Sequence, residues 1–274
     1  MTSRVESARL IPLAREYGRC DRFCAQLAGH IRIMGVRILT YNVHSCRGLD
    51  GRLMPERIAE VIASAGADVA CLQELDVRRE RTGRIHQAEV IAQALAMKYH
   101  FFPAISVETE EYGDAILSRH EITVVRTGAL PRPRLTLEPR GALWVEISDG
   151  ATTWQVINTH LGLGRNERRV QASELAGWIK DAMERRPMIF CGDLNSRSGS
   201  RVHRMLGPGL QEAQFATRGA QRRTFSTSFR WVCLDYIYAS GDVKFRESQV
   251  IDTPLARIAS DHFPLMADVT VEAR

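Results

Sequence analysis

The chain has 274 residues, 45% of them hydrophobic and 25% charged, and we expect a soluble globular protein with one domain. No run of about 18 apolar residues is present, which excludes a membrane-spanning helix. The formal net charge of +5 permits an anionic partner but does not distinguish nucleic acid, anionic lipid and phosphate ester.

The chain begins with a segment, residues 1–33, that carries no motif. It contains arginines but no continuous apolar core, so it is not a secretory signal, and residues 10–27 predict only a weak helix. We interpret residues 1–33 as an N-terminal extension that contributes nothing to activity, with Met34 as the true start.

From Val36 onward the hydrophobic pattern alternates between strands and helices. Helices are predicted at residues 55–65, 85–98 and 166–185, and Ile58, Val61 and Ile62 share one face of the first. Short apolar stretches bounded by turn residues predict strands at 36–41, 68–72, 115–117, 122–125, 143–147, 154–158, 188–191, 233–238, 243–250 and 265–271. This order predicts an α/β fold with two mixed β-sheets packed face to face and flanked by helices.

The six cysteines show no CxxC pair and no metal-binding spacing; they are Cys20, Cys24, Cys46, Cys71, Cys191 and Cys233. The last three lie in apolar, strand-like stretches, where a thiol behaves as a small hydrophobic group. We therefore expect reduced cysteines and a cytoplasmic protein.

The most informative stretch runs from Pro187 to Asn195, where a short apolar strand stops at a glycine. The strand has no polar alternation, which is typical of burial on both faces. Asp193 and Asn195 follow at i and i+2, so both side chains can point the same way. A carboxylate and an amide there suit proton transfer and anion binding, although Asp and Asn after a strand are also ordinary turn residues.

Other predicted strands are also flanked by polar side chains of the kinds that bind metals and phosphate. These are Asn42 and His44, Gln73 and Glu74, Asn158 and His160, Asp235, and Asp261 with His262. Each alone is compatible with a cap, a turn or a surface residue. Together they indicate a common site at the strand ends.

In their order and form these stretches resemble the endonuclease/exonuclease/phosphatase family. The resemblance rests on TYNVH, LQE, GDAILSR, NTHL, CGDLN, LDYIY and SDHFPL, and it covers roughly residues 36–271. The family includes pancreatic-type deoxyribonucleases, abasic-site endonucleases, neutral sphingomyelinases and inositol-polyphosphate phosphatases. The resemblance implies a four-layer α/β sandwich with its site at one end of the sheets, and residues 36–272 as the catalytic domain.

The resemblance also implies a metal site. Glu74 would bind Mg²⁺ or Mn²⁺ directly, with Asn42 beside it and Asp261 completing the ligand set. Oxygen ligands suit a hard divalent ion that keeps several of its waters.

For catalysis, the resemblance implies metal-assisted, in-line attack of water on phosphorus without a covalent intermediate. Asp193 would activate or position the attacking water, while His262, oriented by Asp235, would hydrogen-bond a phosphate oxygen. Asn195 and His160 would steady the phosphoryl oxygens, and Arg140 would add positive charge.

Two further stretches bear on substrate binding. Asp114 stands where many relatives carry Asn, and a carboxylate there would repel phosphate unless it faces the metal or is protonated. The preceding loop at 108–112, which ends at Tyr112, is acidic. Residues 222–231 interleave arginines with aromatic residues, including Arg223 and Phe225. Such a stretch can stack bases, contact a lipid head group or pack at the rim.

The predicted substrate is therefore a phosphate ester, either a nucleic acid or a lipid or small-molecule phosphodiester, and we expect a monomer. A phosphomonoesterase would use the same residues with a different rim. A non-catalytic phosphate-binding module would be expected to lack one of Glu74, Asp193 or His262, and all three are present.

Overall fold

The computed structural model describes residues 35–134, 137–185, 187–229 and 231–271. The expected extension at 1–33, with its weak helix and with Cys20 and Cys24, lies outside these described residues. None of the helices described is both long enough and apolar enough to cross a membrane.

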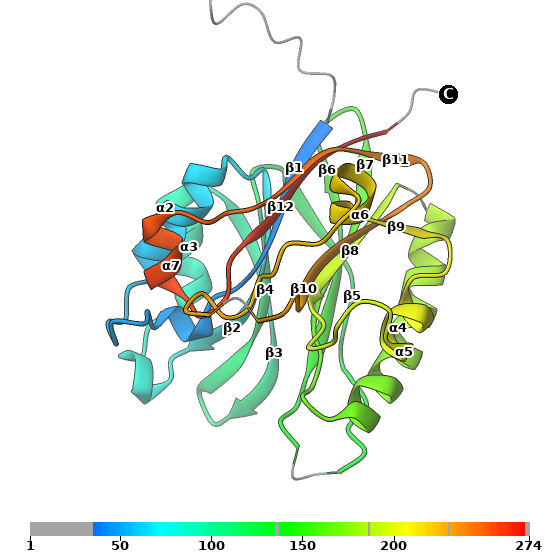
Figure 1. Cartoon of the computed structure of the whole chain (residues 1–274). Helices are drawn as coiled ribbons and strands as arrows, with labels where there is room; N and C mark the ends of the chain where they lie inside the picture. Colours follow the sequence, from blue (N-terminus) through cyan, green and yellow to red (C-terminus); the bar gives the residue numbers. More distant parts are fainter. Residues whose placement is uncertain (1–34, 135–136, 186, 230, 272–274) are drawn as a thin grey trace, which may run out of the picture. The chain divides into compact units, whose positions relative to one another are not determined.

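Two six-stranded sheets form the centre of the described unit (Figure 1). The first has the order β11 (Val243–Val250), β12 (Leu265–Val271), β1 (Gly35–Asn42), β2 (Val69–Val77), β4 (Glu110–Ser118) and β3 (Lys98–Val107). The second has the order β5 (Glu121–Ala129), β6 (Gly141–Ser148), β7 (Thr153–His160), β8 (Met188–Asp193), β10 (Asp235–Ser240) and β9 (Leu210–Glu212). Both sheets are mixed, as predicted.

Helices cover the outer sides of the two sheets and complete the four layers (Figure 1). The helices α2 (Pro55–Ala65), α3 (Gln87–Leu95) and α7 (Pro254–Ala259) accompany the first sheet, and α4 (Arg165–Arg185) and α5 (Arg201–Leu206) accompany the second. The short helix α6 (Ala213–Arg218) lies against β11, and 3-10 turns occupy His44–Cys46 and Glu80–Thr82. The predicted four-layer α/β sandwich is confirmed.

Strand β8 shows why its sequence lacks alternation. Successive side chains of a strand point to opposite faces. Ile189 and Cys191 belong to the core between the sheets, whereas Met188 and Phe190 pack in the second core with α4. Because both faces are buried, every position is apolar until the strand ends at Asp193.

Each sheet contains one parallel pair, β1–β2 in the first and β7–β8 in the second. All other pairings are antiparallel. The carboxyl ends of parallel neighbours meet at the same edge, so Asn42 lies beside Gln73 and His160 lies beside Asp193. These two edges supply much of the site.

Three predicted elements need correction. The helix expected at 85–98 ends at Leu95, because Ala96 adopts a left-handed conformation with φ of 52° and Lys98 begins the edge strand β3, which was not predicted. The acidic loop expected at 108–112 is largely strand, since Glu110 begins β4. The strand expected at 233–238 begins instead at Asp235, because β10 pairs with β8 only from that residue.

The described cysteines, Cys46, Cys71, Cys191 and Cys233, are free and buried. The expectation of reduced thiols is confirmed for these four.

Candidate active site

A cavity of about 520 Å³ opens where the catalytic side chains were expected. Its lining includes Glu74, His160, Asp193, Asn195 and His262. Asp261, Arg140, Tyr112 and Phe225 also line it. Most of the predicted site residues therefore share one cavity, although they come from both sheets.

Glu74 enters the cavity from an irregularity in β2. The pairing of β2 with β4 shifts between Leu72 and Leu75, and Glu74 takes a φ of 64°, which is unusual for a residue with a side chain. The side chain is 23% exposed, so its carboxylate reaches the cavity. Asn42 supports it from β1, with Nδ2 donating to Glu74 Oε1 at 2.9 Å and to Asp193 Oδ2 at 3.1 Å.

Asp193 lies at the end of β8 and is almost fully buried. The preceding Gly192 has a φ of 144°, and a Cβ atom there would lie 1.9 Å from the carbonyl oxygen of Thr159. Glycine is therefore required by the close approach of β7, rather than by a turn. The Asp193 Oδ1 atom accepts the backbone N–H of Asn195 at 2.8 Å, so the two predicted residues are held together.

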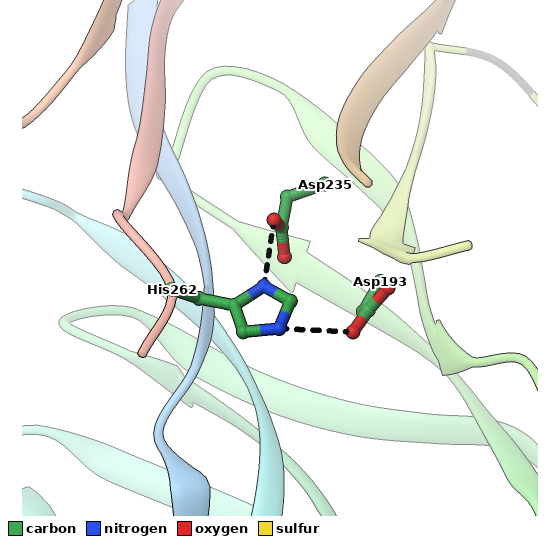
Figure 2. Close-up of side chains that lie close together, drawn as sticks. All are labelled: Asp193, Asp235 and His262. Carbon is green, nitrogen blue, oxygen red and sulfur yellow. Dashed lines mark hydrogen bonds and ion pairs between the residues drawn. The ribbon is translucent and has the colours of Figure 1, made fainter. Parts of the chain in front are cut away.

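His262 and Asp235 form the buried pair shown in Figure 2. Nδ1 of His262 lies 2.9 Å from Asp235 Oδ2, and Nε2 lies 3.7 Å from Asp193 Oδ2. The register of β10 and β8 places Asp235 directly opposite Asp193, which explains how the ring lies between two carboxylates. The second oxygen of Asp235 is buried and receives no hydrogen bond from the described residues, so the imidazole is the group that offsets its charge.

The charges in this group perturb one another. Burial raises the pKa of Asp193 to about 7, while the nearby His262 opposes this shift. Burial alone would lower the pKa of His262, but Asp235 and Asp193 outweigh it and raise that pKa to about 10. His262 is consequently an imidazolium at neutral pH, and Asp193 is poised between its two protonation states.

His160 has the opposite electrostatic environment. Nη1 of Arg140 lies 3.0 Å from its Nδ1 atom, and the amide nitrogen of Asn195 lies 3.1 Å from its Nε2 atom, so a donor group faces each ring nitrogen. Burial lowers the pKa of His160 well below its usual value, and Arg140 and His262 lower it further. Nε2 lies 3.5 Å from Asp193 Oδ2. His160 is thus a neutral imidazole that faces the carboxylate.

Arg140 is held at the cavity wall by Glu138, a residue that the motifs did not indicate. Its Nη1 atom lies 2.9 Å from Glu138 Oε1. Its Nε atom is buried and makes no hydrogen bond to the described residues. Because Arg140 lines the cavity as a largely buried cation, it suits an anionic oxygen supplied by a ligand.

Asp114 lies behind Glu74 and does not line the cavity. The Asp114 Oδ1 atom accepts the backbone N–H of Glu74 at 3.4 Å. Burial raises the pKa of Asp114 to about 8, so the group is largely protonated at neutral pH. A protonated Asp114 would not repel phosphate.

Tyr112 lines the cavity and is almost buried. Two guanidinium groups approach its ring, from Arg79 at 5.9 Å and from Arg81 at 5.6 Å. Arg81 also lines the cavity, so the ring helps to hold a cation at the wall. No motif in the sequence indicated Arg81.

The arginine-aromatic stretch divides between the cavity and the surface. Phe225 packs its ring against His262, with ring centroids 4.8 Å apart. Arg223 is exposed and does not line the cavity. Phe229 and Trp231 are also exposed, at 75% and 70%.

Thr224 supports Asp235 and was not indicated by the motifs. It is buried, and its hydroxyl accepts the backbone N–H of Asp235 at 3.2 Å.

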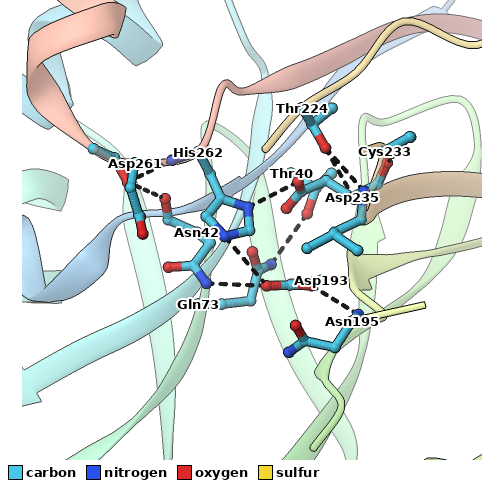
Figure 3. A network of polar contacts seen from close by, with 12 residues as sticks. Thr40, Asn42, Gln73, Asp193, Asn195, Thr224, Cys233, Asp235, Asp261 and His262 are labelled. Carbon is cyan, nitrogen blue, oxygen red and sulfur yellow. Dashed lines mark hydrogen bonds and ion pairs between the residues drawn. The ribbon is translucent and has the colours of Figure 1, made fainter. Parts of the chain in front are cut away.

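A buried polar network lies beside the catalytic side chains, and Figure 3 shows two of its members, Gln73 and Thr40. Nε2 of Gln73 donates to Thr40 Oγ1 at 3.1 Å and to Asn158 Oδ1 at 2.8 Å. Asn158 in turn donates to the carbonyl oxygens of Leu72 and Ala115, both at 3.0 Å. Gln73 and Asn158, which were expected as strand-end residues of the site, instead join the sheets that carry it.

Two sets of residues contain the kinds of side chain that bind metal ions. The first is Glu74 with Asn42 and Asp261; Asp261 lines the cavity, and Glu74 Oε2 receives no hydrogen bond within the described residues. The second is Asp193, Asp235 and His262, whose ligand atoms lie within 4.8 Å of one another. In that set the imidazole meets each carboxylate through a different nitrogen and carries both protons, which leaves no lone pair for a metal. The first set fits a hard divalent ion better.

The fold is a sandwich of two mixed sheets, and one cavity brings together carboxylates, imidazoles and a guanidinium. This combination is typical of hydrolases that act on phosphate esters. The family model described as "Endonuclease/Exonuclease/phosphatase family" matches residues 39–262. The chain belongs to this family, whose members are phosphoesterases and generally depend on a divalent metal. A comparison with curated proteins gives no match.

Solved structures of the same fold include an endonuclease/exonuclease/phosphatase from Beutenbergia cavernae, with 20% identity, a TM-score of 0.69, and coverage of 87% of this chain and 72% of the other. A mannosyl-6-phosphatase from Bacteroides thetaiotaomicron has 19% identity and a TM-score of 0.71, with 86% and 99% covered. The human nocturnin catalytic domain, with bound sulfate, has 19% identity and a TM-score of 0.65, with 87% and 95% covered. At these identities the likeness establishes the fold alone.

Proposed function

We propose that this phosphoesterase is a phosphodiesterase that depends on Mg²⁺ or Mn²⁺ and cleaves by in-line attack of water. The observation that carries the proposal is the placement of Asp193, which faces an imidazolium and a neutral imidazole at the floor of a cavity that also contains Glu74. Acid, base and anion-binding groups therefore converge on a volume that a phosphate group can enter.

Glu74, Asn42 and Asp261 would hold the metal. The Asn42 amide donates to Glu74 and accepts the backbone N–H of His44 at 3.1 Å, so it orients the carboxylate from below. Asp261 lies on the same cavity wall as Glu74. When bound, the ion would supply Lewis-acid polarisation of the phosphoryl group.

Asp193 would take the proton from the attacking water. A general base works best when its pKa is near the pH of the reaction, and the pKa of about 7 meets that condition. Hydrogen bonds from the Asn42 side chain and the Asn195 backbone fix both carboxylate oxygens, so the base is oriented before the substrate arrives.

The remaining groups would bind the phosphoryl oxygens. His262, held positively charged by Asp235, would donate a charge-assisted hydrogen bond from Nε2. His160 and the Asn195 amide, whose nitrogen lies 3.1 Å from His160 Nε2, would contact the same oxygens. Arg140 would place a second positive charge beside them.

The proposed substrate is a nucleic acid or a lipid or small-molecule phosphodiester. Relatives of the same fold include proteins named as a mannosyl-6-phosphatase and as nocturnin, so the fold does not choose among substrates. Tyr112 and Phe225, both at the cavity, would contact the part of the substrate beyond phosphorus, and Asp114 and Arg223 would act from outside the cavity wall. We also propose a monomeric cytoplasmic enzyme, with the four free thiols as support for the compartment.

The test compares bis-p-nitrophenyl phosphate with p-nitrophenyl phosphate in excess Mg²⁺. A phosphodiesterase should give the higher kcat/KM on the diester. A higher kcat/KM on the monoester would make the chain a phosphomonoesterase that uses the same residues. Absence of hydrolysis of either ester would contradict the proposal.

A further inference from the structure

A second cavity, of about 340 Å³, lies next to the catalytic cavity. Its lining includes four arginines, Arg165, Arg168, Arg169 and Arg201, together with the hydroxyl-bearing Ser196 and Ser200. No acidic side chain is among the described residues that line it. We call this the arginine cavity.

Two short loops separate the cavities. Asn195 lines the catalytic cavity and the next residue, Ser196, lines the arginine cavity. Leu163 lines the first and Arg165 lines the second. Consecutive Cα atoms are about 3.8 Å apart, and two residues span at most about 7 Å, so the wall between the cavities is thin.

The one carboxylate in the first turn of α4 is directed away from the arginine cavity. Glu167 is buried, and its Oε2 atom accepts the backbone N–H of Gly164 at 3.2 Å. A Cβ atom on Gly162 would lie 2.0 Å from Glu167 Cδ, so the glycine provides the space for this inward position. The first turn of α4 therefore presents arginines to the cavity, and the compensating acid faces inward.

Four arginines and no acidic residue among the described lining give the arginine cavity a positive charge that favours an anion. Arg168 is hydrogen-bonded to the loop that separates the cavities. Its Nη1 atom donates to the carbonyl oxygen of Leu163 and, at 3.2 Å, to that of Gly162. Burial lowers the pKa of Arg168, and the nearby carboxylate of Glu167 opposes this shift. Guanidinium groups bind phosphate through paired hydrogen bonds, and the two serine hydroxyls add donors.

Building on the proposed function, we propose that the arginine cavity binds a second phosphate of the substrate, and that the substrate is a nucleic-acid strand. Phosphates of a strand recur at every nucleotide and are joined by a flexible sugar-phosphate link. Such a link can cross the wall at Leu163, whose side chain is 73% exposed and can pack against a sugar or base. A hexose bisphosphate carries its two phosphates at a comparable spacing but lacks the base that could pack against Leu163, so the experiment below compares it with the dinucleotides.

The experiment uses three dinucleotides that differ by one phosphate: TpT, and TpT carrying an additional phosphate at its 5′ or its 3′ end. Hydrolysis is measured in Mg²⁺, and binding to the same protein is measured by calorimetry in EDTA. Bis-p-nitrophenyl phosphate reports the catalytic cavity alone. The test variant combines Arg165→Gln, Arg169→Gln and Arg201→Gln, which spares the loop contacts of Arg168; Lys180→Gln on α4, outside the cavity lining, is the control.

We expect one of the two additional phosphates to raise affinity and kcat/KM by about tenfold or more, as a charge-assisted contact should. The triple variant should lose that advantage while keeping its kcat/KM on bis-p-nitrophenyl phosphate within about twofold, and Lys180→Gln should behave as wild type. Equal binding of all three dinucleotides would overturn the inference, and so would a triple variant that keeps the advantage. Tighter binding of a hexose bisphosphate than of any dinucleotide would overturn the assignment to a strand. If the wild type does not hydrolyse bis-p-nitrophenyl phosphate, the proposed function is wrong. The binding data in EDTA would still decide whether the arginine cavity binds a second phosphate.

Discussion

The pair formed by His262 and Asp235 gives the most specific prediction. If Asp235 holds the imidazole positively charged toward the phosphoryl group, then removing either partner should impair the same step. We therefore expect His262→Ala and Asp235→Asn each to lower kcat by about two orders of magnitude or more. The double variant should be little worse than the worse single variant, because residues that act as a unit are not additive.

The magnitude follows from the geometry. The two side chains are buried and meet at 2.9 Å, which is a charge-assisted hydrogen bond. Such a bond contributes about 1.5–3 kcal/mol, and about 1.4 kcal/mol corresponds to a factor of ten. Asp235→Asn removes the negative charge that strengthens this bond and also lowers the fraction of positively charged His262 at neutral pH, so about two orders of magnitude are expected for the pair.

The assay is single-turnover and steady-state hydrolysis of bis-p-nitrophenyl phosphate in saturating Mg²⁺, with Asp181→Asn as a control that removes a carboxylate from the exposed side of α4. The Mg²⁺ concentration for half-maximal rate should barely change in either single variant. Fully multiplicative losses in the double variant would refute the pairing. A large loss of Mg²⁺ affinity in His262→Ala would show that the histidine binds the metal instead.

Four further predictions concern the metal, the strand, the extension and pH. Glu74→Gln keeps the shape of the side chain but removes its charge, so the Mg²⁺ concentration for half-maximal rate should rise by about tenfold or more. Gly192→Ala should lower Tm by several degrees because its Cβ would meet a carbonyl oxygen at 1.9 Å, whereas Gly177→Ala, within α4 and with open space around it, should preserve or raise Tm. Deleting residues 1–33 should leave Tm and kcat nearly unchanged. Burial lowers the pKa of His203 below its unfolded value of 6.5, so stability should fall as pH drops below about 6.5, and His203→Gln should show a smaller loss of Tm between pH 7.5 and 5.

For each of these four predictions, one result would contradict the reasoning. An unchanged Mg²⁺ requirement in Glu74→Gln would remove that residue from the metal site. Equal Tm values for the two glycine variants would show that β7 and β8 can separate without cost. A large drop in Tm on deletion would mean that the first 33 residues pack on the domain, and identical acid profiles for wild type and His203→Gln would assign the acid sensitivity to other groups.

The sequence predicted the layers and most strand ends because these depend on local signals. Pro55 and Gly66 bound α2, and the uninterrupted apolar stretch of β8 reflects burial on two faces. Asp193, Glu74 and His262 were found because polar residues next to apolar strands are conspicuous. Their convergence depended on the resemblance to the family, since no local pattern reveals that the ends of β1 and β2 lie near those of β7 and β8 in the other sheet.

What the sequence missed depends on contacts between distant segments. Glu138 was not selected because an acid in a loop carries no signal until Arg140 is seen beside it. Gln73 was placed in the site, yet it joins the sheets, because its neighbour Asn158 comes from the other sheet. The edge strand β3 was missed because Pro103 interrupts its pattern, and an edge strand tolerates that interruption.

The most direct test of metal-dependent phosphoester hydrolysis is a metal titration of the EDTA-treated wild-type protein with bis-p-nitrophenyl phosphate, with Asp193→Asn prepared in parallel to exclude a contaminating enzyme. We predict no hydrolysis in EDTA, full recovery on addition of Mg²⁺ or Mn²⁺, and a loss of at least about two orders of magnitude in Asp193→Asn. Hydrolysis that persists in EDTA, or equal rates in the wild type and Asp193→Asn, would contradict the account.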